Sequence, residues 1–167
     1  MEIGRSKAGI QICQRKYALD VLSKTGLLAA KPSPLPMEPN SKLRKDKGNL
    51  FHDPTLYPKL VGKLLYLTNT RPDLSYSVNL LSQFMENPRV KHYDAMIKIL
   101  KYIKGTPSQG IFLPASLNME LVAYADANWA NCPDMQRSTT EFCVFIGTSR
   151  SSAESEYKAM AAGCRRM

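Results

Sequence analysis

The chain has 167 residues, of which 44% are apolar, and a formal net charge of +9. This length suits one ordinary domain or two small ones, and the sequence has neither a signal-like apolar start nor an apolar run that could span a bilayer. The four cysteines form no C-x-x-C pair, which argues against a zinc site or a disulfide framework. We therefore expect an intracellular protein, cytoplasmic or nuclear, that is not inserted in a membrane.

The first forty residues predict a hairpin, a helix and an extended connector. Met1–Arg5 and Gly9–Cys13 are typical of two short strands joined by a turn. Gln14–Thr25 has helical spacing of apolar residues and ends before Gly26. The next segment, KPSPLPMEPN, has four prolines within eight residues. Proline lacks an amide donor and disfavours helix in the preceding residue, so this segment is expected to be extended.

Residues 53–105 predict three amphipathic helices in a row. Asp53-Pro54 opens the first, Thr70-Arg71-Pro72-Asp73 and Asn87-Pro88 separate the three, and Gly105 ends the last. The side chains expected to face inward are Tyr57, Leu60, Val61, Leu64, Leu65, Leu67, Leu74, Val78, Leu81, Met85, Tyr93, Met96, Ile97, Leu100 and Ile103. The lysines on the opposite faces of the first and third helices are Lys59, Lys63, Lys91, Lys98 and Lys101.

His92 falls at the edge of the apolar face of the third helix. No carboxylate or cysteine stands at ligand spacing from it. We expect a hydrogen-bonded packing histidine rather than a metal ligand.

From residue 111 onward the sequence becomes strand-like. Ile111–Leu113, Leu121–Ala125 and Arg137–Ile146 predict strands, and Glu154–Ala162 predicts a final helix introduced by two serines. The two parts are expected to meet near Pro114–Met119. The chain as a whole is predicted to be α+β.

Charge is distributed unevenly between these parts. Residues 1–118 have 18 Lys/Arg and 8 Asp/Glu, whereas residues 119–167 have 5 and 6. A basic first part favours a polyanion such as a nucleic-acid backbone as partner. An excess of lysine that only maintains solubility is the alternative.

Two carboxylates are candidate metal ligands. Asp126, in YADANWA, is expected at the end of a strand, and Glu156, in SSAESEYKAM, in the first turns of a helix. Magnesium prefers hard oxygen ligands, and paired magnesium ions can activate water for phosphodiester cleavage. By itself this pattern is weak evidence, since an acid after a strand and another in a helix are common.

Several short sequence motifs occur in a distinctive order. They are RKYALDVLSKTGLLAAKPSPLPMEPN, YPKLVGKLLYLTNTRPD, KILKYIKGTP, YADANWA, RSTTEFCVFIG and SSAESEYKAM. Together they cover nearly the whole chain, and their order resembles that in copia-type retrotransposon polyproteins. The similar segment of that family runs from the end of the reverse transcriptase into the start of the ribonuclease H domain.

The resemblance implies a division into two regions. Residues 1–113 would be a mainly helical thumb- and connection-like region, and residues 119–167 a truncated ribonuclease H-like α/β piece. In that family a first-strand aspartate and a first-helix glutamate are the catalytic metal ligands. Their counterparts here are Asp126 and Glu156, with Glu154 as the neighbouring alternative and Mg²⁺ as the implied cofactor.

The chain also departs from the family pattern. It contains no Y-x-D-D motif, so polymerase chemistry is not expected. Only Thr148-Ser149-Arg150 separate two motifs that normally enclose a further strand, and Asn128 stands where an aspartate is frequent. The chain ends at Met167, before the positions of the remaining carboxylates. Because catalysis needs a complete and well-placed ligand set, we expect little or no nuclease activity from this chain alone.

The leading hypothesis is a polyprotein fragment that retains at most non-specific binding to an RNA–DNA hybrid or another duplex. Its phosphate contacts would come from Lys59, Lys63, Lys91, Lys98 and Lys101. One alternative is a weak Mg²⁺-dependent ribonuclease H. Another is an inert or protein-associating remnant with unpaired strand edges. The sequence indicates no oligomeric state.

Overall fold

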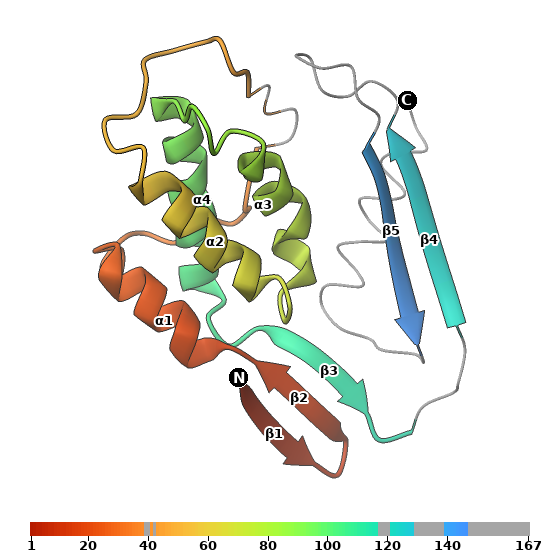
Figure 1. The fold of residues 1–167 in the computed structure, drawn as a ribbon. Coiled ribbons are helices and arrows are strands. Elements are labelled where there is room, and N and C mark those ends of the chain that lie inside the picture. Colours follow the sequence, from red (N-terminus) through yellow and green to blue (C-terminus); the bar gives the residue numbers. More distant parts are fainter. Residues whose placement is uncertain (39–40, 42, 117–120, 129–138, 147–167) are drawn as a thin grey trace. The chain divides into compact units, whose positions relative to one another are not determined.

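Helices and strands occupy different stretches of the chain (Figure 1). The computed structural model describes residues 1–38, 41, 43–116, 121–128 and 139–146. The fold is α+β, as predicted, and it divides into two compact units. The first contains residues 1–2 and, where the structure describes them, 12–110; the second contains residues 3–11 and the described residues from Ile111 onward. The first hairpin thus belongs mainly to the second unit, whereas the sequence places it with the helices; the division into functional domains stays a prediction.

A three-stranded sheet brings the start of the chain next to a strand from its middle. Its order is β1 (Glu2–Ser6), β2 (Gly9–Cys13) and β3 (Gly110–Pro114). In the β1–β2 turn the Ser6 hydroxyl donates to the carbonyl of Gly9. A Cβ on Gly9 would lie 2.2 Å from the carbonyl oxygen of Leu113, so this close approach requires glycine. The predicted hairpin is confirmed.

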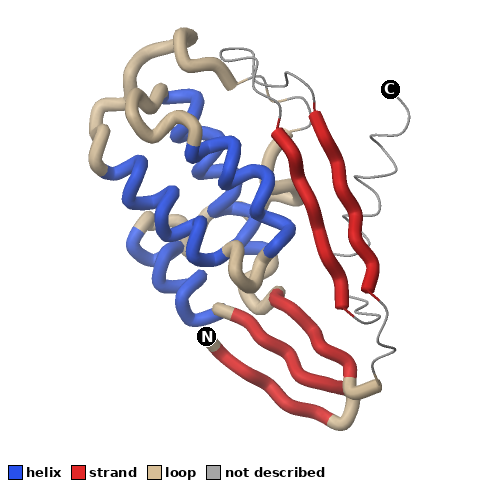
Figure 2. Tube along the Cα trace, turned by 45° about the vertical axis from the view of Figure 1, so that its right-hand side comes forward, coloured by secondary structure: helices blue, strands red, loops and turns tan. Residues whose placement is uncertain are grey.

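The helical unit contains α1 (Arg15–Lys24), α2 (Leu56–Leu67), α3 (Ser75–Ser82) and α4 (Val90–Gly105), with a short 3-10 turn, η1 (Pro72–Leu74), between α2 and α3. These helices lie against one another (Figure 2). Their shared core is apolar. Its fully buried members include Leu22, Tyr57, Val61, Leu64, Leu67, Leu74, Leu81, Met96, Ile99, Leu100 and Ile103.

The inward face of α2 follows the predicted spacing closely, whereas that of α4 is rotated. Ile99 and Tyr102 are buried although their positions were not predicted to face inward. Tyr93 and Ile97, which were predicted to do so, are only partly buried. The connector between α1 and α2 covers part of α4, so α4 is buried from more than one side.

The start of α2 is fixed by Asp53. Its carboxylate accepts hydrogen bonds from the Thr55 hydroxyl and from the backbone N–H groups of Thr55 and Leu56, at 2.8–3.0 Å. These bonds, that of the hydroxyl first, lower the pKa of Asp53. The helix itself begins at Leu56, slightly later than the sequence predicts, because Pro54 and Thr55 form the turn that Asp53 closes.

The second unit also contains a two-stranded antiparallel sheet. It pairs β4 (Leu121–Asn128) with β5 (Thr139–Ile146), and its register places Asp126 opposite Glu141. The predicted strand over Leu121–Ala125 is therefore longer, and Asp126 lies within it. The predicted helix over residues 154–162 lies outside the described residues. None of the helices in the described ranges combines the length and apolarity needed to cross a bilayer.

Candidate nucleic-acid interface

The outward side of α2 brings two of the predicted lysines together. Lys59, Gly62, Lys63 and Tyr66 stand three, four and seven residues apart, so they share one side of the helix. Lys59 and Gly62 are exposed, Lys63 is half-buried, and Tyr66 is 48% exposed. We call these four residues the α2 face. No acidic residue occurs anywhere in α2, so the helix presents only positive charge.

Tyr66 extends this face toward α1. Its ring meets the ring of Tyr17 edge-on, with centroids 5.0 Å apart and an interplanar angle of 74°. Burial, and to a lesser degree the neighbouring Tyr66, raises the pKa of Tyr17. Tyr17 is therefore a neutral phenol near pH 7. The two rings, each with an apolar body and a polar hydroxyl, lie beside the two lysines.

The other three predicted lysines lie on α4, where the connector approaches. The ammonium of Lys98 forms an ion pair with the Glu38 carboxylate, and the backbone carbonyl of Lys101 accepts the N–H of Ser33 at 3.2 Å. Lys104 donates to the carbonyl of Ala30. Lys91 is exposed. The structure thus places the five lysines in two groups on different helices, and part of the α4 group is engaged within the chain.

A second stretch of the connector is held at the start of α4. The Arg89 guanidinium donates to the carbonyls of Lys45 and Gly48 at 3.0 and 2.9 Å. His92 Nδ1 accepts the Arg89 N–H at 3.0 Å, and His92 Nε2 lies 3.1 Å from the carbonyl of Arg44. Since a carbonyl only accepts, Nε2 carries the proton.

The His92 ring is buried, at 1% exposure, and stacks on Phe84 with centroids 3.9 Å apart. The prediction of a hydrogen-bonded packing histidine is confirmed.

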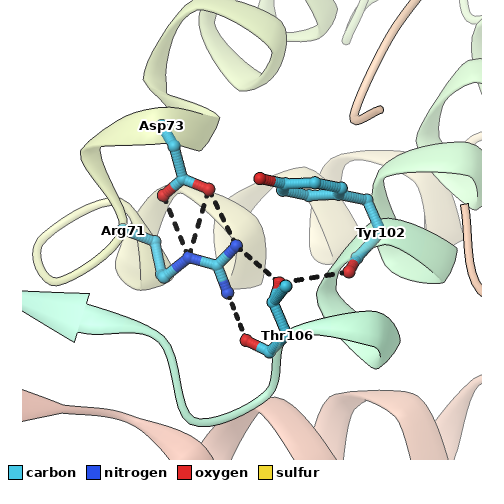
Figure 3. Close-up of polar contacts among 4 residues, drawn as sticks. All are labelled: Arg71, Asp73, Tyr102 and Thr106. Carbon is cyan, nitrogen blue, oxygen red and sulfur yellow. Dashed lines mark hydrogen bonds and ion pairs between the residues drawn. The ribbon is translucent and has the colours of Figure 1, made fainter. Parts of the chain in front are cut away.

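A buried ion pair lies between α2 and α3, and its arginine is hydrogen-bonded to the residue that follows α4 (Figure 3). Arg71 Nε and Nη2 donate to the Asp73 carboxylate at 2.9 and 2.8 Å. Arg71 Nη1 donates to the Thr106 carbonyl at 2.8 Å, and Nη2 also donates to the Thr106 hydroxyl at 3.0 Å. The guanidinium carbon also lies 5.5 Å from the centroid of the Tyr102 ring.

Arg71 and Asp73 are 3% and 5% exposed, so this network is part of the interior rather than a ligand site. From the sequence, Thr70-Arg71-Pro72-Asp73 is predicted only as a break between two helices. An arginine and an aspartate two residues apart, across a proline and between two apolar helices, were the signal that could have revealed the pair.

The two candidate carboxylates are not brought together by the described residues. Asp126 lies in β4, while Glu156 and its alternative Glu154 fall outside the described ranges. Within those ranges no three His, Cys, Asp or Glu side chains are grouped so that they could hold a metal ion. The magnesium site therefore stays a prediction.

Comparisons with known proteins identify the family of this chain. No protein-family model matches the chain, and no solved structure matches it. Curated relatives do match. The Retrovirus-related Pol polyprotein from transposon RE1 of Arabidopsis thaliana is 42% identical over 174 aligned residues, which cover 96% of this chain. The corresponding polyprotein from transposon TNT 1-94 of Nicotiana tabacum is 33% identical over 83% of the chain.

The chain belongs to the copia-type family of retrovirus-related transposon Pol polyproteins, as its sequence motifs predict. It spans only 12% of the RE1 polyprotein and 11% of the TNT 1-94 polyprotein. A shorter relative is the Arabidopsis uncharacterized mitochondrial protein AtMg00810, which is 37% identical; the alignment covers 96% of this chain and 72% of that protein.

Proposed function

We propose that this chain is a segment of a copia-type Pol polyprotein that binds duplex nucleic acid without sequence preference and lacks polymerase and nuclease activity of its own. Residues 1–113 would be the thumb- and connection-like end of the reverse transcriptase. Residues 119–167 would be a truncated ribonuclease H-like piece. The partner would be an RNA–DNA hybrid or another duplex.

The observation that carries this proposal is the charge of the α2 face. Lys59 and Lys63 point the same way from a helix without a single acidic residue. Among the described residues, neither lysine has a carboxylate within ion-pair distance. Two unneutralised cations one helical turn apart suit the regularly spaced phosphates of a nucleic acid. Lys91, Lys98 and Lys101 on α4 would contribute less, because the connector engages that side.

Two facts support the absence of nuclease activity. The alignment with the RE1 polyprotein runs over 174 positions but covers only 96% of the 167 residues of this chain, so part of the matched region of the relative has no counterpart here. Asn128, at the end of β4, also offers no carboxylate beside Asp126. Two carboxylates would leave much of the repulsion between two magnesium ions uncompensated.

A salt titration tests the binding proposal. Binding of the purified chain to a fluorescently labelled RNA–DNA hybrid should weaken linearly in log K against log salt, as expected when phosphate contacts release counterions. Binding that is absent, or that does not change with salt, would refute the proposal and favour an inert or protein-associating remnant.

A hydrolysis assay tests the enzymatic alternative. The chain is incubated with labelled hybrid and Mg²⁺ beside an Asp126→Ala control. We expect no RNA cleavage above the control. Cleavage that requires both Asp126 and Mg²⁺ would instead establish a weak ribonuclease H that uses Asp126, and loss of that cleavage in Glu156→Ala would assign the second ligand.

A further inference from the structure

Gly62 interrupts the outward side of α2. It lies in the middle of a 12-residue helix, where glycine is less favourable than any residue except proline. Apart from its two chain neighbours and the backbone of its own helix, a Cβ built on Gly62 would meet no atom within 4 Å, and the Gly62 backbone is not left-handed. Neither packing nor backbone conformation in the described chain therefore requires glycine at this position.

The neighbours of Gly62 on the α2 face are all larger and polar or charged. Lys59 lies almost one turn before it, Lys63 follows it directly, and Tyr66 lies one turn after it. The glycine thus leaves a low point on the helix surface between two positive side chains and a phenol. At such a point a partner can approach the helix backbone more closely than any side chain would allow.

We propose that Gly62 is where the sugar–phosphate backbone of a duplex nucleic acid rests on the α2 face. Lys59 and Lys63 then contact phosphates on either side, and Tyr66 lies against the adjoining sugar. This inference rests on the proposed function and deepens it, because it assigns the binding surface and explains the exposed glycine. It concerns contact with the backbone rather than with base edges, and therefore implies no sequence preference.

The charge of the α2 face and its number of exposed aromatic rings favour a duplex over other partners. A second copy of the chain, related by two-fold symmetry, would bring the same lysines against each other. Surfaces that bind single strands present successive aromatic rings for stacking. The α2 face has one exposed ring, that of Tyr66, which already contacts Tyr17.

The experiment uses the full chain with Gly62→Gln, and with Asn79→Gln as the matched control at an exposed position of α3. Affinity for a labelled RNA–DNA hybrid is measured by fluorescence anisotropy, and stability by the urea midpoint. We expect Gly62→Gln to weaken binding by about tenfold or more. Its urea midpoint should not fall, because glutamine is a better helix former than glycine. Asn79→Gln should leave the affinity unchanged and raise the urea midpoint only slightly, because glutamine is also a better helix former than asparagine.

Gly62→Ala provides a second test in case the longer side chain disturbs folding. Alanine adds one carbon, so it should weaken binding less than glutamine while raising the urea midpoint. Stronger stability together with weaker binding cannot result from unfolding and would support the contact.

Other outcomes separate this inference from the proposed function. If the wild-type chain binds the hybrid with a steep salt dependence but Gly62→Gln and Gly62→Ala bind equally well, the inference is overturned and the proposed function stands. Absence of binding by the wild-type chain overturns both. Equal affinity for a single strand of the same length, or loss of self-association in Gly62→Gln with unchanged hybrid binding, overturns the choice of a duplex.

Discussion

The outer sides of α2 and α4 have the same sequence pattern but different surroundings. Each helix has a buried apolar side and, facing away from it, lysines at helical spacing. On α2, Lys59 and Lys63 lie on a side that no described carboxylate neutralises. On α4, Lys98 is paired with Glu38, and the connector forms hydrogen bonds along the helix from Arg89 to Lys104. Amphipathic spacing therefore shows which side of a helix points away from the core, but not whether another segment covers that side.

The difference follows from the composition of the connector. Its prolines cannot join a helix or a central strand, and this keeps the segment extended. The carbonyl groups of Ala30, Arg44, Lys45 and Gly48 in this connector accept hydrogen bonds from the side chains of Arg89, His92 and Lys104, at the start of α4 and within it. Part of the positive charge of α4 thus binds the connector, whereas the lysines of α2 remain available to a partner.

The largest expected effect concerns the network that joins the ends of the two helices. Asp73→Ala would leave the Arg71 guanidinium buried without a counter-ion, which typically costs about 3–5 kcal/mol. Urea unfolding of the full chain measures this loss. The matched control is Asp46→Ala, which breaks an exposed ion pair with Arg44 and should change stability by less than about 1 kcal/mol. A similar result for both variants would show that the buried Arg71–Asp73 pair contributes no more to stability than an exposed pair.

The difference between the lysines of α2 and those of α4 is tested by two double variants that change the charge equally. Lys59→Gln/Lys63→Gln should lower the slope of log K against log salt for hybrid binding by about 1.8, since each lost phosphate contact contributes about 0.9. Lys98→Gln/Lys101→Gln should lower it by clearly less. Fluorescence anisotropy over a salt series measures both slopes. Equal slopes would mean that binding follows net charge alone and that the two helices do not differ.

The inner side of α2 can be tested through Tyr57, whose buried hydroxyl donates to the carbonyl of Leu81 in α3 at 3.0 Å. Tyr57→Phe should lower the free energy of unfolding by about 1 kcal/mol at neutral pH, because the carbonyl loses this hydrogen bond and keeps only that from the Phe84 N–H.

Burial raises the pKa of Tyr57, which predicts a pH dependence. The folded chain retains a phenol proton that the unfolded chain releases near the ordinary pKa of about 10. The stabilisation is therefore complete below that pH and is lost as pH rises above it. Urea unfolding across this alkaline range should show a steeper loss for the wild type than for Tyr57→Phe. Tyr76→Phe, at an exposed position, should retain the wild-type slope; a Tyr57→Phe curve parallel to the wild type would contradict the assignment.

The smallest expected effect is at the connector. Glu38→Gln breaks an ion pair in which the glutamate is 66% exposed, so stability should change by less than about 1 kcal/mol. The freed Lys98 could then reach a phosphate, and the slope of log K against log salt should steepen by at most about 0.9. Glu86→Gln, at an exposed position after α3, makes the same charge change and should leave the slope as it is. Equal slopes for the two variants would show that Glu38 does not restrain Lys98.

Most of the local structure of the described residues could be predicted from the sequence. Prolines, glycines and apolar spacing indicated all four helices and the first hairpin, and each boundary falls within a few residues of its prediction. These signals are local, so they depend only on neighbours along the chain. The rotation of α4 was missed because Ile99 and Tyr102 are buried by residues far away in sequence, and no periodicity within the helix reports such contacts.

The candidate interface could be predicted only in part. Lys59 and Lys63 were recognised because lysines opposite an apolar stripe are expected to be exposed. Gly62 and Tyr66 were not singled out, since their significance depends on the open space around the glycine and on the contact with Tyr17. The partners of Lys98 and Arg71 were also missed, because Glu38 and Thr106 are separated from them by 60 and 35 residues.

The sequence by itself determined the family, the helices and their apolar sides, and the excess of positive charge in the first part of the chain. These properties follow from the order and kind of residues within short segments. Only the tertiary structure decided which lysines are free and which are engaged, that Arg71 and Asp73 form a buried pair, and that Gly62 lies open between two cations. The physical reason is that exposure and pairing depend on distances across the fold, and such distances are set by packing between segments that are remote in the chain.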